Sequence, residues 1–105
     1  MQIITLTEAK TQLGVTFSAT DAAITLLVNG IEAEILSYLN APTLDAALAH
    51  VPDEMAGMAE EAIRNAVRVN LAPRRDDSAF DIWKGGRLTR ALFAFKVPGF
   101  GPGTD

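Results

Sequence analysis

Apolar residues recur every three or four positions along most of the chain, the pattern of amphipathic helices. The two longest runs occupy residues 18–40 and 52–72. The first run places its apolar side at Ile24, Leu27, Val28, Ile31, Ile35 and Leu39. The second places it at Met55, Met58, Ala59, Ala62, Ile63, Ala66 and Leu71. The pattern predicts an all-α fold, a small bundle of three main helices plus a short C-terminal helix and an extended C-terminal arm.

The first main helix is short and begins at a predicted capping box. Thr5 and Glu8 have the spacing at which the hydroxyl and the carboxylate cap each other's backbone N–H groups. Leu6 and Leu13 then fall on one helix face. Gly14 is expected to end the helix, because glycine adopts the left-handed conformation without steric cost.

The second main helix carries the strongest apolar pattern of the chain. Ser18 and Asp21 stand at capping spacing before it, and Asn40 followed by Pro42 is expected to end it. Gly30 lies in the middle of the helix, where glycine costs about 1 kcal/mol relative to alanine. A close helix–helix approach would offset this cost, but the sequence shows no such compensation.

Prolines mark the limits of the third main helix. Pro52 suits a first helical position, and Pro73 is expected to end the helix. Residues 43–50 form either one helical turn or a connecting loop. Residues 74–86 are interpreted as a polar loop, and a fourth, shorter helix is predicted over residues 87–95.

The composition of the chain indicates one domain and excludes several kinds of chemistry. It has 105 residues, of which 49% are hydrophobic, and it contains no cysteine. Disulfides and thiolate metal sites are therefore excluded, and His50, the single histidine, makes a zinc site improbable. Residues 1–97 are expected to form one helical domain and residues 98–105 a flexible Gly/Pro-rich arm.

The chain shows no pattern of a signal peptide or a membrane span. The opening "MQIITLTEAK" has no basic start followed by an apolar run. The most apolar stretch, residues 22–39, contains Asn29, Glu32 and Glu34, which a lipid environment penalises. We therefore expect an amphipathic helix of a protein that has no membrane partner.

No group of residues fits a catalytic or metal site. Asp76, Asp77 and Asp81 are clustered, but Asp81 stands where a calcium loop of the EF-hand type needs glycine. Ser18 and Ser37 have no neighbouring base to activate them. We therefore expect no catalytic residue, no metal and no cofactor, and hence no enzyme.

Charge is distributed unevenly along the chain. The formal net charge is −4, yet residues 1–63 carry about −8 and residues 64–105 about +4 by simple count. Two interpretations remain open. The distribution is either that of an ordinary solvated surface, or it lets an acidic face of one subunit meet a basic face of the next, which is a head-to-tail contact.

Six charged residues are candidates for contacts between subunits or with DNA. A DNA-binding face is one interpretation of the arginines, but the pI of about 4.8 argues against a dedicated DNA-binding domain. Pairing with acidic partners, within or between subunits, is favoured instead. An acidic lumen would also let DNA slide through a ring, and this is a hypothesis. The six residues are Arg64, Arg68, Arg74, Arg75, Glu32 and Glu34.

Aromatic residues near the C-terminus are candidates for partner docking. They are Trp83, Phe93, Phe95 and Phe100. Trp83 is either a buried anchor or an interface residue. Phe95 shares helical spacing with Leu92, so the alternative to partner docking is that Phe95 packs within the subunit. Beyond Pro98 no periodicity remains, so Phe100 is predicted to anchor the arm on a neighbour.

The order of these segments resembles that of the head–tail connector family of long-tailed phages and prophages. The resemblance rests on residues 5–13, on Asp21 opening a long helix that closes with Tyr38-Leu39-Asn40, on Val51-Pro52 and on the end Ala91-Leu92-Phe93. Residues 70–75 and Phe95-Lys96 depart from the family pattern.

The resemblance implies a structural role without catalysis. It implies a helical subunit of a closed homo-oligomeric ring of about a dozen copies. The ring would sit in the virion between the portal protein and the next connector or tail-completion protein, and DNA would pass through its channel without sequence-specific binding. Assembly would take place in the cytoplasm of the bacterial host. The alternatives are a small helical DNA-binding regulator and a dimerising interaction module.

Overall fold

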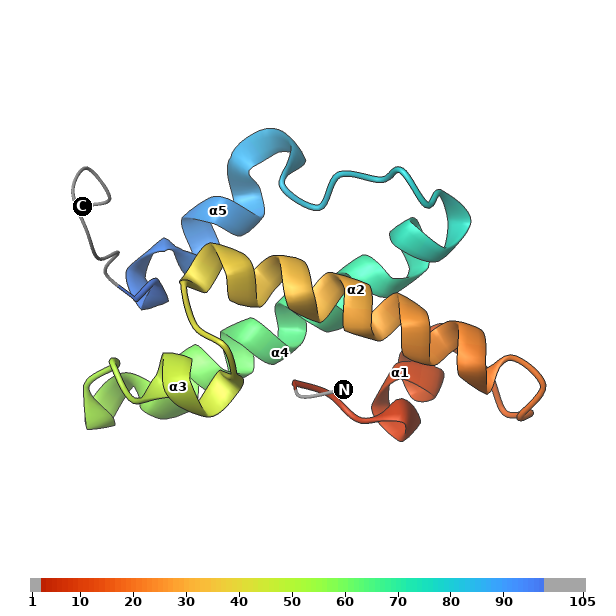
Figure 1. Ribbon diagram of the computed structural model, residues 1–105, viewed down its shortest axis with the longest axis horizontal. Coiled ribbons are helices and arrows are strands. Elements are labelled where there is room, and N and C mark those ends of the chain that lie inside the picture. Colours follow the sequence, from red (N-terminus) through yellow and green to blue (C-terminus); the bar gives the residue numbers. More distant parts are fainter. Residues whose placement is uncertain (1–2, 98–105) are drawn as a thin grey trace.

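The protein is a small helical bundle. The computed structural model describes residues 3–97, and regular elements in this range are all helical. They are α1 (Leu6–Leu13), α2 (Asp21–Leu39), α3 (Leu44–Leu48), α4 (Asp53–Asp76) and α5 (Arg87–Leu92), with 3₁₀ turns at Lys84–Gly86 and Phe93–Phe95. The long helices α2 and α4 pack against each other, α1 and α3 lie along one side, and α5 lies along the other (Figure 1). The predicted all-α fold is confirmed.

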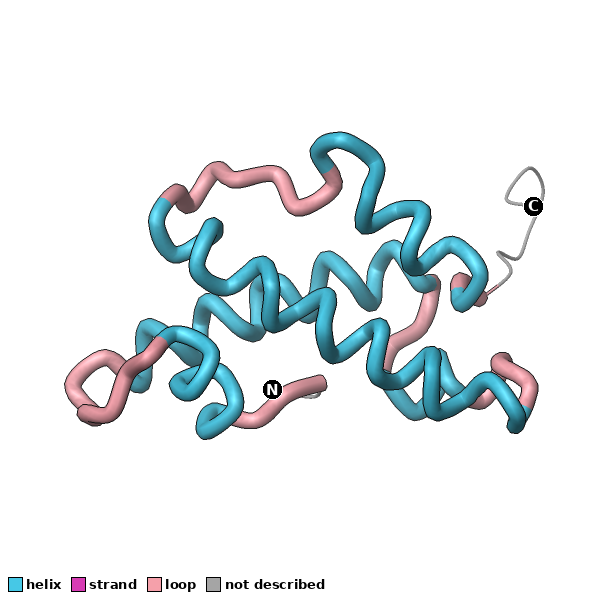
Figure 2. Tube along the Cα trace, turned by 180° about the vertical axis from the view of Figure 1, so that it is seen from behind, coloured by secondary structure: helices cyan, strands magenta, loops and turns pink. Residues whose placement is uncertain are grey.

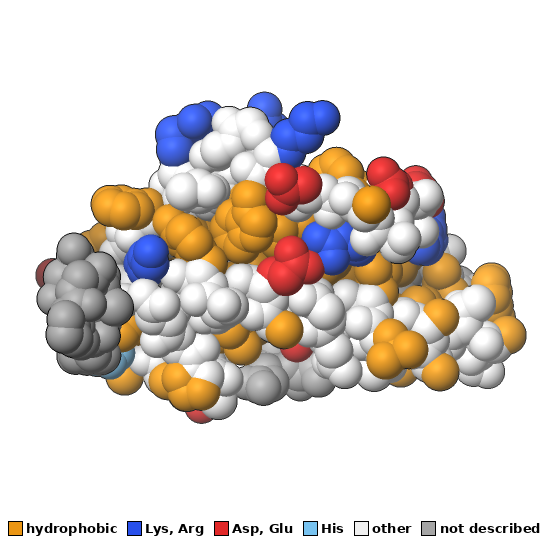
Figure 3. Space-filling model, turned by 45° about the horizontal axis from the view of Figure 1, so that its top comes forward, with side chains coloured by type: hydrophobic (Ala, Val, Ile, Leu, Met, Phe, Trp, Pro, Cys, Tyr) orange, Lys and Arg blue, Asp and Glu red, His pale blue; other side chains and the backbone are white. Residues whose placement is uncertain are grey.

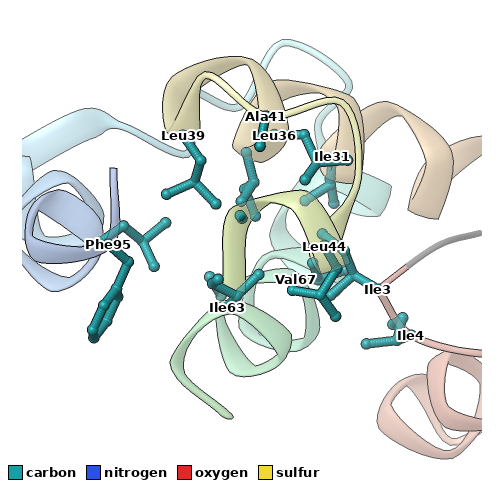
Figure 4. Packing of buried hydrophobic residues seen from close by; sticks show 14 of the residues in the cluster. Ile3, Ile4, Ile31, Leu36, Leu39, Ala41, Leu44, Ile63, Val67 and Phe95 are labelled. Carbon is teal, nitrogen blue, oxygen red and sulfur yellow. The ribbon is translucent and has the colours of Figure 1, made fainter. Parts of the chain in front are cut away.

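The core lies between α2 and α4 and is closed at its edges by both ends of the described chain. Ile3 and Ile4 pack from the N-terminal side, and Phe95 packs from the C-terminal side (Figure 4). Leu92 belongs to the same buried cluster. Each fully buried aliphatic side chain stabilises the fold by about 1.5–3 kcal/mol relative to exposure. The side chains that are least exposed are Ile3, Ile31, Ile35, Leu39, Ile63, Leu71, Leu92, Val28 and Val67.

The predicted capping of α1 is confirmed. The Thr5 Oγ1 accepts the N–H of Glu8 at 3.1 Å, and the Glu8 carboxylate accepts the N–H of Thr5 at 3.0 Å. Gly14 follows the helix at φ 72°, the left-handed conformation that ends it.

The predicted cap of α2 by Ser18 is wrong. The helix begins at Asp21 after Thr20, and no side chain caps it. The Asp21 carboxylate instead forms an ion pair with Lys10 at 2.8 Å and so ties α2 to α1. The predicted end is confirmed, because Asn40 adopts the left-handed conformation at φ 59°.

The predicted end of the third main helix at Pro73 is wrong. Helix α4 contains Pro73 and continues to Asp76. Proline there removes only the hydrogen bond to the carbonyl of Val69, which lies on an exposed part of the helix where water can replace it. Pro52 precedes α4 as its N-cap and is not its first residue, so the predicted start is displaced by one position.

Met58 is predicted in the core, with an adaptable binding surface as the alternative, and it lies outside the core. Its side chain is 59% exposed. Ala59, the next residue, is buried, and successive residues of a helix point about 100° apart. Met55 is partly buried against the core, as predicted.

Residues 43–50 contain a helical turn, the first of the two predicted alternatives. Thr43 caps α3 by accepting the N–H of Ala46 at 3.0 Å.

By length and composition alone, the stretch Asp21–Leu48, with a mean hydropathy of 1.4, is apolar enough to cross a membrane. Core helices meet the same criterion, and here α2 packs its buried side against α1 and α4. Figure 2 shows the same arrangement from behind.

Candidate functional site

Glu32 lies inside the subunit. It is 3% exposed, and its Oε2 accepts the backbone N–H groups of Ile3 at 2.8 Å and Ile4 at 2.9 Å. The carboxylate therefore holds the N-terminal segment of the described chain against α2. The sequence predicts that Glu32 contacts a neighbouring subunit or DNA; within the subunit its carboxylate is used for these backbone hydrogen bonds, and any contact with a partner stays a prediction.

Arg74 and Glu34 form an ion pair between α4 and α2. The Arg74 Nη1 lies 2.6 Å from Glu34 Oε2, and the Arg74 Nε donates to the carbonyl of Phe80 at 2.9 Å. The hydrogen bond to Glu34 raises the pKa of Arg74, against the lowering effect of burial, and the negative charges of Asp81 and Asp77 raise it further. The pair holds the end of α4 to α2 and positions the loop that follows.

The other predicted arginines also have acidic neighbours in the same chain. Arg64 pairs with Glu60 at 2.8 Å and donates a hydrogen bond to the carbonyl of Ile3. Arg68 lies 3.2 Å from Glu61. The more exposed Arg75 lies 3.6 Å from the adjacent Asp76. Pairing within the subunit was one of the alternatives for these residues. Whether a neighbour or DNA contacts them as well stays a prediction.

Trp83 joins an aromatic cluster beside the end of α2. Its ring centroid lies 4.9 Å from that of Tyr38, and the Lys96 ammonium lies 4.9 Å from the Tyr38 ring centroid. The Tyr38 hydroxyl donates to the carbonyl of Thr89 at 3.4 Å. Trp83 is half-buried, so the structure keeps both its predicted roles: it anchors the loop on α2 and presents an edge at the surface.

The two described phenylalanines of the C-terminal segment lie on opposite sides of the chain. Phe93 is 69% exposed, whereas Phe95 is 7% exposed and packs in the core. Phe93 therefore stays a docking candidate, and Phe95 follows its alternative prediction of packing within the subunit. Val97 continues the chain along α2 by donating its N–H to the carbonyl of Leu39 at 2.8 Å. Phe100 lies outside the described residues.

The aspartates after α4 have local structural roles. Asp77 Oδ1 accepts the N–H of Ala79 at 3.0 Å, and Asp81 Oδ1 accepts the N–H of Trp83 at 2.9 Å. Both contacts are turns in which an aspartate side chain hydrogen-bonds the backbone two residues ahead. Across residues 3–97, no three acidic or histidine side chains gather as a group able to hold a metal ion.

The sequence did not reveal which charges lack a partner inside the subunit. In the part of the chain that the structure describes, three basic side chains, all exposed, have no ion pair or ring contact; they are Lys84, Arg87 and Arg90. Three exposed acidic side chains in the same range have no ion pair or hydrogen bond; they are Asp45, Asp53 and Glu54. Only the pairing of the other charges, which depends on the fold, identifies these six.

The three unpaired basic side chains line one groove. It lies between α4 and the segment 80–91 and has a volume of about 550 Å³. Figure 3 shows Lys and Arg side chains gathered along the edge of the molecule that α5 forms. We call this site the basic groove. Its apolar lining includes Ala62, Ala66, Val69, Pro73, Leu88 and Ala91.

The three unpaired acidic side chains belong to two neighbouring elements at another place. Asp45 belongs to α3, and Asp53 and Glu54 to the first turn of α4. These two elements pack against each other, and α3 lies on the side of the bundle away from α5 (Figures 1 and 2). We call this site the acidic corner. The fold thus separates the charges left unpaired into one site of each sign.

A family model matches most of the folded chain. Residues 3–82 match the model described as "Phage gp6-like head-tail connector protein". No curated protein and no solved structure gives a significant match. The matched range runs from the N-terminal segment held by Glu32 to the loop held by Arg74, and so includes α1 to α4.

The chain belongs to the phage gp6-like head–tail connector family. This membership makes it a structural component of the phage virion, acting where head and tail join, and confirms the predicted resemblance. The family is structural and is not a known class of enzyme.

Proposed function

We propose that the protein is a subunit of a closed ring that docks between the portal protein and the next connector or tail-completion protein. DNA passes through the channel of the ring without sequence-specific binding. The single observation that carries this proposal is the family match over residues 3–82. The subunits assemble in the cytoplasm of the bacterial host, on the portal or before they meet it.

The distribution of charge supports a ring over a regulator of DNA. The chain has a net charge of −4, and Arg64, Arg68 and Arg74 lie beside acids of the same subunit. A regulator would bind duplex DNA with an affinity that falls steeply with salt. A dimerising module would give a two-subunit species at every protein concentration above its dissociation constant.

Native mass spectrometry tests the proposal. The chain is measured alone and after mixing with the portal protein of the same phage. We expect a species of about twelve subunits in at least one of the two samples. A chain that stays monomeric or dimeric in both samples would contradict the ring, and strong duplex binding by that species would favour the regulator.

The segment 98–105 is proposed to be the arm that contacts a neighbour or the portal. It lies outside the described residues, so its role follows from its sequence. Deleting it should leave the helical circular dichroism signal unchanged and weaken docking on the portal. Loss of the helical signal in the truncated protein would show that the segment belongs to the core.

A further inference from the structure

We propose that the acidic corner of one subunit docks in the basic groove of the next. This inference rests on the proposed ring and names the surfaces that would join its subunits. The partner is therefore a second copy of this chain. Each copy offers both surfaces and uses each of them once.

The acidic corner presents exposed negative charge and one exposed apolar side chain. Asp45, Asp53 and Glu54 are exposed and have no ion pair within residues 3–97. Met58 lies one turn beyond Glu54 on α4 and exposes 59% of its surface. A methionine side chain adapts its shape to an apolar partner, so the corner combines negative charge with an adaptable apolar side chain.

The basic groove offers the complementary surface. Lys84, Arg87 and Arg90 line it, and Val69, which is 50% exposed, lies among its apolar residues. Asp81 also lines the groove, but its carboxylate accepts the Trp83 N–H, and its charge acts on Arg74. The groove therefore presents three positive charges around an apolar lining, which complements the three negative charges of the acidic corner and the exposed Met58.

The positions of the two surfaces favour a head-to-tail contact. The groove lies beside α5, and the corner lies at α3 and the start of α4, so the two surfaces occupy different places on the subunit (Figures 1 and 2). Two unlike surfaces at different places on one subunit give a heterologous contact, which closes into a ring when the rotation between subunits allows it. The paired charges also add a local attraction between neighbours, which opposes the repulsion between subunits of net charge −4.

The apolar lining of the groove favours a protein partner over DNA. Phosphate groups would satisfy Lys84, Arg87 and Arg90 but would leave Val69 and its apolar neighbours without a contact. An acidic protein surface that carries Met58 satisfies both. DNA in the groove is therefore the competing outcome of the test.

Disulfide cross-linking tests the contact directly, because the chain contains no cysteine. The variant carries Met58→Cys and Val69→Cys together. These positions lie about three turns apart on α4, roughly 16 Å, which is too far for a disulfide within one chain. We expect oxidation to give a ladder of cross-linked chains longer than a dimer, and reduction to remove it.

The control variant carries Leu26→Cys and Val69→Cys. Leu26 is 73% exposed on α2 and belongs to neither surface. Each variant is oxidised under conditions in which the wild-type chain forms its ring, alone or on the portal. A ladder in the control, a dimer band only, or no cross-link in the test variant would each overturn the proposed contact while the ring itself stands.

Charge reversal gives an independent readout. The groove variant carries Arg87→Glu and Arg90→Glu, and the corner variant carries Asp53→Lys and Glu54→Lys. We expect each variant alone to lose at least ten-fold in the fraction of chains assembled, and an equimolar mixture to regain assembly, since each restores the charge that the other lacks. Circular dichroism checks that both variants are folded.

The remaining outcomes contradict the inference in distinguishable ways. If the groove variant assembles like the wild type but loses duplex affinity, the groove faces DNA. If the mixture of folded variants fails to assemble, the two surfaces do not meet. If the wild-type chain forms no ring even with the portal, the proposed function fails and this contact falls with it.

Discussion

The buried carboxylate of Glu32 accepts the backbone N–H of Ile3 at 2.8 Å and so fixes the start of the described chain to the middle of α2. The contact closes the core on the α1 side, because Ile3 itself is 1% exposed. Arg64 on α4 donates to the carbonyl of the same residue. Both backbone polar groups of Ile3 are thus satisfied by charged side chains from the two central helices.

Replacing Glu32 should therefore destabilise the fold without any partner present. Glu32→Gln keeps the shape and one acceptor but removes the charge, and we expect a loss of about 1–3 kcal/mol in the free energy of unfolding. Glu32→Ala leaves two buried N–H groups unpaired and should cost more. Urea denaturation followed by circular dichroism measures both. Unchanged stability in Glu32→Ala would refute the structural role.

Arg74 should stabilise the loop after α4, because its guanidinium N–H groups bind both Glu34 and the carbonyl of Phe80. Arg74→Lys keeps the charge but loses the paired contact with Glu34 and the bond to Phe80, and we expect a loss of about 1 kcal/mol because the pair is partly solvated. The raised pKa of Arg74 keeps the guanidinium charged at all ordinary pH values. Its contribution should be lost only as pH rises through that raised pKa, so it should be constant from pH 5 to 9. A dependence of the Arg74→Lys loss on pH within that range, measured by denaturation, would argue against this assignment.

Gly30→Ala should stabilise the subunit. A Cβ atom at Gly30 would meet no atom within 4 Å, so the close approach that would explain this glycine is absent within the described subunit. We expect a gain of about 0.5–1 kcal/mol, seen as a higher midpoint of thermal unfolding. Gly14→Ala is the matched control with the opposite sign, because Gly14 has φ 72°. Equal effects of the two changes would contradict the structural explanation.

Phe93 and Phe95 should differ sharply when replaced. Phe95→Ala removes a core side chain and should cost about 3–5 kcal/mol in stability, whereas Phe93→Ser changes an exposed position and should cost about 0.5 kcal/mol or less. If Phe93 docks a partner, its replacement should weaken portal binding while the fold is kept. Pull-down on the portal combined with thermal unfolding separates the two effects. Full binding by Phe93→Ser would remove it from the docking surface.

The repeating apolar pattern predicted the helices well, because burial of one face is what forms them. Thr5, Glu8 and Asn40 have the local roles that their chemistry indicates. The predicted helix end at Pro73 was wrong, since a proline in the last turn removes only one hydrogen bond, which water can replace. The predicted burial of Met58 was wrong, because alanines at neighbouring positions already complete the buried face of α4.

The candidate site was less predictable, because the partner of a charge depends on the whole fold. Glu32 was selected as a charge in an apolar helix, and nothing local showed that Ile3 and Ile4 would reach it from far along the chain. Arg74 and Glu34 are likewise distant in sequence. The asymmetry between the two halves of the chain was visible, but the six charges left unpaired emerged only once the others had been matched.

Electron microscopy of the chain mixed with its portal protein tests the central claim most directly. The account predicts a closed ring of this chain, coaxial with the portal and surrounding a continuous channel wide enough for duplex DNA. Portal particles that carry no added ring at saturating concentrations of the chain, or that carry it away from the channel axis, would contradict the account.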